Sequence, residues 1–341
     1  MSLPLAFTCG DPAGIGPEVA VAAAGDERVR AVCQPILIGS AASIDEAAGR
    51  LGVDVNSIAV RPVTSDGSAP LGKPTAAGGQ IAYESLIAAI DGVTASKDYA
   101  GIVTAPLNKY SLQLAHREGR IDCPHPGHTE ILAERAGAGE GFAMMLHVPH
   151  GRVARGPAGL SIAHVTLHTS VASVPGRLSV EGIAEAAALL DRYLPYLGCG
   201  RPRIAVAALN PHGGEGGLFG DEETRLIAPA VDLARRRLPH ATIAGPLPCD
   251  TLIRRAMLGE FDGVVAMYHD QGHIPVKLVA FDEAINITLG LPLTRTSPTH
   301  GTAFDIVGRQ PANAEGMVQA ALTAARMIGN GLRPTGDRKS E

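Results

Sequence analysis

Hydrophobic and polar residues follow two recurring patterns along this chain. Short apolar runs typical of buried strands, such as residues 4–8, are followed by segments whose apolar residues recur at helical spacing, such as residues 18–24. We predict strands at residues 4–8, 31–38, 58–63, 99–103, 142–148, 160–168, 204–209, 242–248, 264–267 and 285–289. We predict helices at residues 18–24, 41–51, 80–93, 130–136, 180–194, 221 or 222 to 238, and 314–328. Strands that alternate with helices indicate an α/β protein with mostly parallel sheets covered by helices.

The strands at 142–148 and 160–168 break this alternation, because only the loop 149–159 joins them. They resemble a hairpin, and a chain of 341 residues is long enough for two domains. We expect a large α/β domain from residues 1–125 and 295–330. We expect a second α/β domain from residues 126–294, with the metal and substrate site at the cleft, and a polar tail at 331–341.

Composition narrows the class of protein. Hydrophobic residues make up 45% and charged residues 18%, as in a globular protein with a substantial core. The net charge is -5 and no long basic run occurs, which argues against a nucleic-acid partner. No apolar run is long enough to span a membrane, and the N-terminus lacks the features of a secretory leader. The five cysteines are far apart and odd in number, which favours the reducing cytoplasm.

Three histidines each close an apolar, strand-like run: His168, His212 and His269. Ligands of α/β proteins bind at the carboxyl ends of strands. Three imidazoles that leave a coordination position open are typical of a catalytic metal site. Such a site forms only if the fold gathers these strand ends. The alternative is a single general-base histidine among unrelated surface ones.

Other segments offer groups that bind anions. The turn GDPAGIGPE at residues 10–18 allows a phosphate on a helix N-terminus, or is a structural turn. His128 and Thr129 precede a predicted helix and form an anion seat, or Thr129 only caps it. Lys277, Asn286 and Arg295 can bind phosphate or carboxylate, or are solvated.

Several motifs together resemble the 4-hydroxythreonine-4-phosphate dehydrogenase family of vitamin B6 biosynthesis. Besides residues 10–18, they are PGHTE at 126–130, NPHGGEGG at 210–217, GPLPCDT at 245–251, YHDQG at 268–272 and NITLGLPLTRTS at 286–297. The resemblance runs from about residue 5 to residue 330.

The resemblance implies an NAD-dependent, metal-assisted oxidation of 4-phosphohydroxy-L-threonine, followed by decarboxylation to 3-amino-2-oxopropyl phosphate. It implies one divalent metal (zinc, magnesium, cobalt or manganese) on His168, His212 and His269. It implies a homodimer with its site at the interface, so that these histidines need not come from one chain. It also implies catalytic roles for Lys277 and Asp250, and substrate contacts from His128, Thr129, Lys277, Asn286 and Arg295.

The segment HGTAFDIVG at residues 300–308 is similar to the adenosine-binding loop of isopropylmalate and isocitrate dehydrogenases, which also lack GxGxxG. This similarity implies their two-domain fold and NAD binding, with NADP as the alternative. The implied cofactor contacts are His300, Gly301, Thr302, Ala303 and Asn313. The alternative for this segment is an ordinary turn before the last helix.

The chain departs from the family pattern in two places. TSVAS at 169–173 replaces the expected segment after His168, and the loop 149–159 is longer than usual. His164 is the fallback ligand if His168 is misaligned. Both departures leave open a paralogue acting on erythronate or threonate 4-phosphate, or on a cis-dihydrodiol carboxylate such as the terephthalate dihydrodiol. A non-catalytic metabolite-binding protein is a further alternative, whereas no nucleophile-elbow motif supports a hydrolase.

Overall fold

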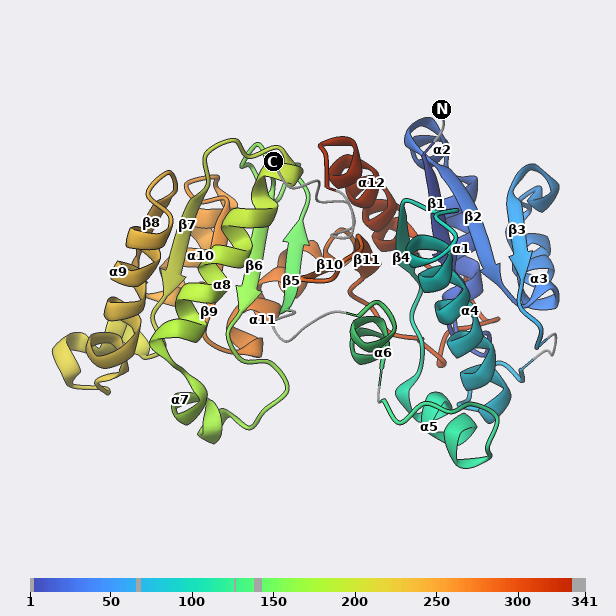
Figure 1. Cartoon of the computed structure of the whole chain (residues 1–341), viewed down its shortest axis with the longest axis horizontal. Helices are drawn as coiled ribbons and strands as arrows, with labels where there is room; N and C mark the ends of the chain where they lie inside the picture. Colours follow the sequence, from blue (N-terminus) through green and yellow to red (C-terminus); the bar gives the residue numbers. More distant parts are fainter. Residues whose placement is uncertain (1–2, 66–68, 126, 138–142, 333–341) are drawn as a thin grey trace. The chain divides into compact units, whose positions relative to one another are not determined.

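The computed structural model describes residues 3–65, 69–125, 127–137 and 143–332. The chain divides by its internal contacts into two compact units (Figure 1). Unit 1 combines Met1–Phe142 with Leu291–Glu341, and unit 2 is Ala143–Gly290. These limits differ from the expected 125/126 and 294/295. The first lies later because helix α6 (His128–Arg135) packs Ile131 and Leu132 into the apolar core of unit 1.

The strands of unit 1 form a parallel arrangement. Their order is β3 (Ala59–Pro62), β2 (Gln34–Gly39), β1 (Pro4–Thr8), β4 (Gly101–Thr104) and β11 (Arg295–Pro298). Phe7 lies opposite Leu37 on one side and Val103 on the other. The polar segments after β1 and β4 therefore leave the sheet at the same edge.

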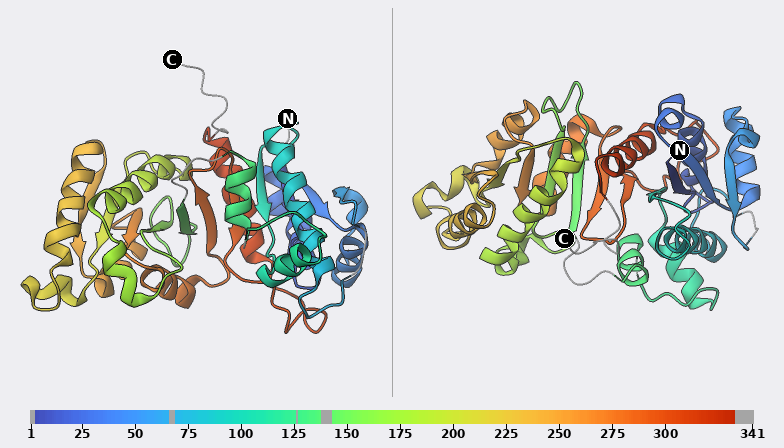
Figure 2. Two further views of the ribbon diagram at one scale, coloured as in Figure 1. Left: turned by 60° about the horizontal axis from the view of Figure 1, so that its bottom comes forward. Right: turned by 45° about the horizontal axis from the view of Figure 1, so that its top comes forward.

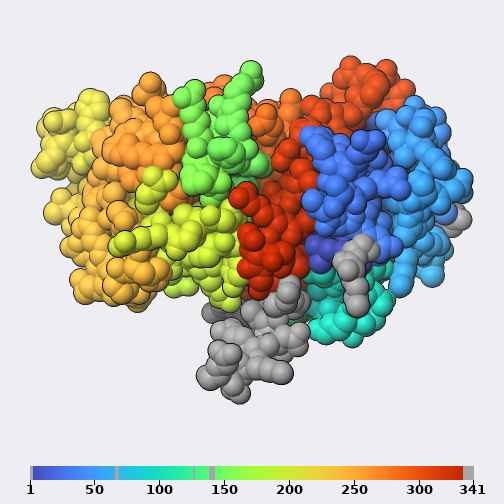
Figure 3. Space-filling view, turned by 90° about the horizontal axis from the view of Figure 1, so that it is seen from above, coloured from blue at the N-terminus to red at the C-terminus, as the bar shows by residue number. Residues whose placement is uncertain are grey.

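Two groups of helices cover the strands of unit 1 (Figure 2). One group is α1 (Gly16–Gly25), α2 (Glu27–Val32), α3 (Ala41–Leu51) and α12 (Glu315–Gly329), with the short η1 (Val55–Ser57) after α3. The other is α4 (Ala76–Thr94), α5 (Lys109–Arg117) and α6. Figure 3 shows α12, in red, against the blue N-terminal segments. An ion pair of 2.8 Å between Arg28 and Glu315 joins α2 to α12.

Unit 2 contains a mixed arrangement of strands. Their order is β10 (Ile285–Leu289), β5 (Ala143–Val148), β6 (Leu160–His164), β9 (Gly263–Ala266), β7 (Arg203–Ala207) and β8 (Thr242–Leu247). β5 is antiparallel to β10 and β6, so the predicted hairpin is confirmed. β6, β9, β7 and β8 are parallel to one another. The α/β class with mostly parallel strands is therefore confirmed.

Helices pack on both faces of the unit 2 strands. α8 (Val180–Tyr193) and α9 (Ala228–Arg237) pack together, whereas α10 (Cys249–Met257) and α11 (His269–Ala280) contribute Leu252, Val276 and Ala280 to one apolar cluster with the strands. The shorter helical segments are η2 (Val171–Ser173), α7 (Val174–Arg177), η3 (Leu194–Leu197), η4 (Pro211–Gly217) and the π-helical η5 (Glu223–Ile227).

Some predicted elements were wrong at their ends. Residues 31–32 belong to α2 and not to a strand, because the Asp26 side chain accepts from the backbone N–H of Arg28 and starts a helix there. The strand predicted to reach His168 ends at His164, so these two histidines do not share a strand. α5 was missed altogether, although Asn108 caps it through the N–H groups of residues 110 and 111.

The largest difference concerns the segment from His269, for which no helix was predicted. It folds as the twelve-residue helix α11 although Pro275 lies inside it. Gln271 explains the start of this helix, because its Oε1 accepts from the N–H of Met267 and its Nε2 donates to the carbonyl of Ala208. The helix therefore carries His269 in its first turn.

Candidate active site

Four of the predicted site residues of unit 2 follow neighbouring parallel strands. His168 comes after β6, His269 after β9, His212 after β7 and Asp250 after β8. The carboxyl ends of parallel strands lie at one edge of a sheet, which we call the strand-end edge. The fold therefore places these four residues in that order along one edge.

His168 and His269 are brought together at the strand-end edge. Their ring centroids are 6.0 Å apart. Both line a cavity of about 230 Å³ together with Thr169, Tyr268 and Asp270. With metal–nitrogen distances of about 2.1 Å and each ring centroid about 1.1 Å beyond its nitrogen, two imidazoles on a tetrahedral cation have centroids roughly 5.3 Å apart. The observed separation of this pair is within about 1 Å of that value.

In two of the predicted ligands, Nδ1 of the imidazole is hydrogen-bonded to a carboxylate, which leaves Nε2 as the nitrogen that could bind a cation. The Nδ1–H of His269 donates to Asp270 Oδ1 at 2.7 Å, and that of His212 donates to Glu215 Oε2 at 3.2 Å. A carboxylate accepts only, so these contacts place the neutral-ring proton on Nδ1. Metal-binding histidines typically have such partners. With the proton on Nδ1, each Nε2 carries a lone pair, and such a donor fits a divalent cation.

His212 lies on a strained turn. Its φ is 52° and that of Glu215 is 44°, and residues 213, 214, 216 and 217 are glycines with positive φ. Non-glycine residues rarely adopt this region, and such strain is concentrated at functional sites. The base of the turn is held by Glu223, whose Oε1 accepts from the N–H groups of Leu209 and Asn210 at 2.8 and 2.7 Å. Glu223 was not predicted from the sequence as a site residue.

His212 does not join the other two histidines within one chain. Its side chain is 68% exposed, and the ring contact it makes is with Phe219, at 6.5 Å. Among the described residues, no three His, Cys, Asp or Glu side chains are placed to share one cation. The single chain thus assembles a pair of candidate ligands, not three.

Behind His269 lie two buried histidines. The ring of His273 stacks on His269 at 3.7 Å with an interplanar angle of 9°, and His164 lies 4.7 Å from His273. Burial, and then the neighbouring imidazoles, lower the pKa of His164 to about 3 and that of His273 to about 4. Both rings are therefore neutral at physiological pH. Of these two residues, only His164 was predicted from the sequence, as a fallback ligand.

Lys277, Asn286 and Asp250 occupy separate elements of unit 2. Lys277 is exposed on α11, on the same helix face as His269 and His273 at i+8 and i+4. Asn286 lies in β10 opposite Leu146 of β5. Asp250 is exposed in the first turn of α10, where its Oδ1 accepts from the N–H of Thr251.

In unit 1 the predicted anion-binding residues gather at the N-terminus of α6. Gly127, not Thr129, is the N-cap, and no side chain caps the helix. Burial, and then the charges of Arg295 and Lys109, hold the pKa of His128 well below its usual range. Both cations therefore lie close to a neutral imidazole. An uncapped helix N-terminus flanked by cations favours an anion.

Arg295 is fixed beside this seat. It is 6% exposed, and its Nε and Nη2 donate to Thr104 Oγ1 at 3.1 and 2.7 Å. Burial lowers its pKa to about 10, so the guanidinium remains charged. Ile102 of β4 lies opposite Arg295 of β11, and Thr104 comes two residues later, on the same face of β4 as Ile102. The strand pairing therefore places the Thr104 hydroxyl near Arg295.

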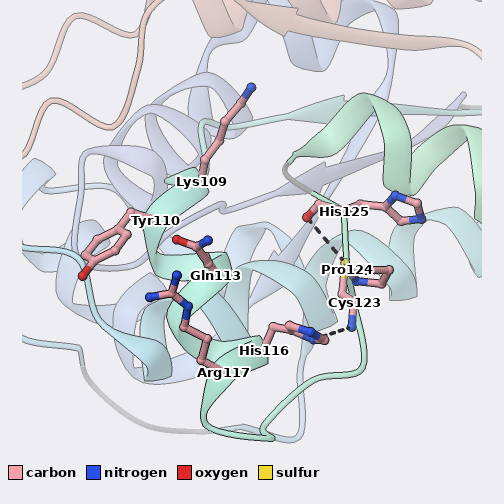
Figure 4. Close-up of a pocket in the computed structure, with 8 residues that line it drawn as sticks. All are labelled: Lys109, Tyr110, Gln113, His116, Arg117, Cys123, Pro124 and His125. Carbon is pink, nitrogen blue, oxygen red and sulfur yellow. Dashed lines mark hydrogen bonds between the residues drawn. The ribbon is translucent and has the colours of Figure 1, made fainter.

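A cavity of about 480 Å³ lies beside Lys109, between α5 and residues 123–125 (Figure 4). Its lining contains the cations Lys109 and Arg117 and the imidazoles of His116 and His125. A Cβ atom placed on Gly127 would lie 3.3 Å from Lys109 Cε, so this lysine covers the start of α6. Lys109 was not named by the sequence analysis, and its position after the predicted strand 99–103 was the available signal.

The glycine-rich turn after β1 packs against the segment that was predicted to bind the cofactor. The N–H of Ile15 donates to the carbonyl of Thr302 at 3.0 Å, and a Cβ on Gly14 would lie 2.5 Å from that oxygen. The turn therefore packs against residues 300–303, which favours the structural interpretation of residues 10–18. Ala303 has a φ of 44°, and Asn313 Oδ1 accepts from the N–H of Glu315 at the start of α12. His300 Nδ1–H donates to the carbonyl of Gly301.

Comparison with known proteins places the chain in a class of α/β proteins whose named relatives are dehydrogenases. It is 41% identical to a 4-hydroxythreonine-4-phosphate dehydrogenase of Desulfosudis oleivorans, over 95% of this chain and 97% of that one. It is 36% identical to a D-threonate 4-phosphate dehydrogenase of Salmonella typhimurium, over 95% and 98%.

The chain belongs to the PdxA family of pyridoxal phosphate biosynthetic proteins, whose model matches residues 31–324. The predicted family is thereby confirmed. A 4-hydroxythreonine-4-phosphate dehydrogenase structure from Klebsiella pneumoniae matches with a TM-score of 0.77 and 34% identity, over 96% of this chain and 99% of that one. A terephthalate 1,2-cis-dihydrodiol dehydrogenase from Burkholderia xenovorans LB400 matches with a TM-score of 0.62 and 28% identity, over 96% and 98%. Within the described ranges, no helix has the length and hydrophobicity needed to cross a bilayer.

Proposed function

We propose that this chain is an NAD-dependent, metal-assisted dehydrogenase that oxidises the secondary alcohol of 4-phosphohydroxy-L-threonine. Loss of CO₂ from the resulting ketone then gives 3-amino-2-oxopropyl phosphate. The observation that carries the proposal is the His168–His269 pair, 6.0 Å apart at the strand-end edge, in a family whose relatives are named for this reaction. When bound, a divalent cation supplies Lewis acidity toward the alcohol oxygen, and a nicotinamide accepts the hydride.

The chain's own residues bind and orient the substrate in this proposal. His128, Thr129 and Arg295 hold the phosphate at the uncapped start of α6, with the charge of Lys109 nearby. Asn286 and Lys277 contact the remainder of the substrate. Lys277, together with Asp250, moves protons to and from the reacting oxygen and carbon.

We propose that a second copy of the chain completes the cation site with its own His212. Most of the exposed large apolar residues of unit 2 lie close in sequence to the candidate ligands. They include Val171 after His168, Leu218 and Phe219 after His212, and Ile274, Leu278, Val279 and Phe281 on and just after α11. A water-exposed apolar surface of this kind favours a protein interface. A homodimer would cover it and bring the strained His212 turn to the His168–His269 pair.

For the cofactor, residues 300–303 and Asn313 are proposed to bind the adenosine part of NAD, with NADP as the alternative. The packing of this loop on Gly14 and Ile15 supports a fixed binding surface. The cation is zinc, magnesium, cobalt or manganese; imidazole ligands suit zinc, whereas magnesium and manganese prefer oxygen ligands. The five free cysteines support a reducing cytoplasm as the location.

D-Threonate 4-phosphate is the second candidate substrate, because a relative at 36% identity is named for it. The departure after His168 favours a changed pocket, since residues 171–173 form the short helix η2 there. Erythronate 4-phosphate and the terephthalate dihydrodiol are the other candidates on this scaffold.

The test is NADH production by the purified full chain with each candidate substrate, NAD and one divalent cation at a time. We expect turnover of 4-phosphohydroxy-L-threonine that a chelator abolishes and added cation restores. The dephosphorylated substrate is the matched control for the phosphate seat. Absence of turnover with 4-phosphohydroxy-L-threonine, alongside turnover of D-threonate 4-phosphate, would replace the first assignment with the second.

A further inference from the structure

The two buried histidines behind His269 have no part in the proposed reaction. We propose that His273 and His164 are positioning residues, which hold the His269 ring in the orientation that cation binding requires. We call the three rings the histidine stack. The inference rests on the proposed function, because it assumes that His269 is a cation ligand.

His273 fixes the plane of His269. It lies one helical turn later on α11, is 6% exposed, and its ring is parallel to that of His269 within 9° at 3.7 Å. Its own ring is fixed because Nδ1–H donates to the carbonyl of His269 at 3.1 Å. The side chain of His269 is 35% exposed, so its outer side is open to solvent. On its inner side, the contact with the His273 ring limits rotation. The Asp270 carboxylate holds its Nδ1, so plane and tautomer are set by different neighbours.

His164 supports His273 from the strand side. It closes β6, is 4% exposed, and its ring lies 4.7 Å from that of His273 at an angle of 41°. Neither of its ring nitrogens has a hydrogen-bond partner of normal geometry among the described residues. Native structures rarely keep a buried polar group in that state, and an apolar side chain would pack there without the desolvation penalty. An imidazole at this position therefore indicates a role beyond filling the core.

Gly272 allows the stack to form. A Cβ atom at this position would lie 2.3 Å from His164 Nε2 and 3.0 Å from Ile162 Cγ2. Any other residue would push α11 away from β6 and separate His273 from His164. The exposure of the rings also decreases inward, from exposed His168 through half-exposed His269 to buried His273 and His164. The stack thus joins the candidate ligand pair to the rigid core of unit 2.

The test compares His273→Leu, which removes the flat ring, with His273→Phe, which keeps it without the nitrogens. Co²⁺ affinity and the visible Co²⁺ absorption spectrum are measured on the full chain, with the melting temperature recorded for each variant. We expect His273→Leu to weaken Co²⁺ binding by about 10–100-fold and to shift the spectrum, as loss of outer-shell partners typically does. His273→Phe should keep the affinity within about threefold. A purely structural role would lower the melting temperature without changing the Co²⁺ spectrum.

His147→Leu is the matched control, because His147 is buried in β5 outside the stack and should leave Co²⁺ affinity unchanged. Should His273→Leu fail to fold, His273→Met takes its place, since methionine adapts to the same space. Affinity at the wild-type level in the Leu or Met variant, or an equal loss in His273→Phe, overturns the inference. Failure of the proposed function looks different: the wild type itself would bind no Co²⁺, or His269→Ala would bind it as tightly.

Discussion

The turn that carries His212 should depend on a single buried carboxylate. Glu223 is 5% exposed and accepts three hydrogen bonds: from the N–H groups of Leu209 and Asn210 and from Asn210 Nδ2. A hydrogen bond to a charged group contributes about 1.5–3 kcal/mol, and a buried donor left without a partner costs about as much. Glu223→Ala removes all three and should lower the free energy of unfolding by roughly 4 kcal/mol.

Glu223→Gln keeps one carbonyl oxygen and the same shape. It should cost about 2 kcal/mol, because the remaining bonds are neutral and the amide N–H₂ faces that of Asn210. Urea unfolding followed by far-UV circular dichroism measures both, and an unchanged m-value would show that only stability changed. Displacing His212 by about 1 Å should also lower kcat by roughly 100-fold.

The neighbouring Glu222 provides the control. Its Oε2 also accepts from Asn210 Nδ2, at 2.7 Å, but it is half-buried, and among the described residues this is the one hydrogen bond between it and the turn. Glu222→Gln should cost under about 1 kcal/mol. A Glu223→Ala chain that loses less than about 1 kcal/mol, or that keeps wild-type kcat, would refute this account of the turn.

Three further predictions follow from contacts in the two units. The pKa of buried His164 is lowered to about 3, so the unfolded chain binds one more proton than the folded chain between that pH and its ordinary pKa near 6.5. In chelator-treated protein, the stabilisation from this ring should be complete above pH 6.5 and should fall by about 1.4 kcal/mol per pH unit below it. In urea unfolding at pH 5–7, His164→Leu should reduce this dependence of the free energy of unfolding on pH. An unchanged dependence would contradict the lowered pKa of His164. Gly14→Ala would place a Cβ 2.5 Å from the Thr302 carbonyl and should raise the KM for NAD, whereas the control Gly49→Ala meets nothing within 4 Å and should leave it unchanged. Thr104→Val removes the hydroxyl that accepts from Arg295 and should raise the KM for the phosphorylated substrate by about tenfold, with no effect on the dephosphorylated one; equal effects on both would argue against a phosphate seat.

The local hydrophobic pattern was sufficient to predict an element where tertiary packing and the intrinsic preference of its residues favour the same secondary structure. The strand 4–8 and the helix 41–51 were predicted with their observed limits. The strand is a continuous apolar run that is buried, and the helix buries only its apolar face. The start of α11 was missed because Gly272 and Pro275 disfavour a helix locally. Burial of Val276 and Ala280 in the core of unit 2 outweighs that preference.

The sequence by itself determined the α/β class, the family and the residues that end the strands, because these depend on local hydrophobic period and on motifs read in order. It also placed histidines after three strands. Only the tertiary structure decided that β6 and β9 are neighbours, which brings His168 to 6.0 Å from His269 and leaves His212 on its own strained turn. Strand order and the approach of His164 to α11 depend on contacts between residues about a hundred positions apart, and no local pattern along the chain encodes such distances.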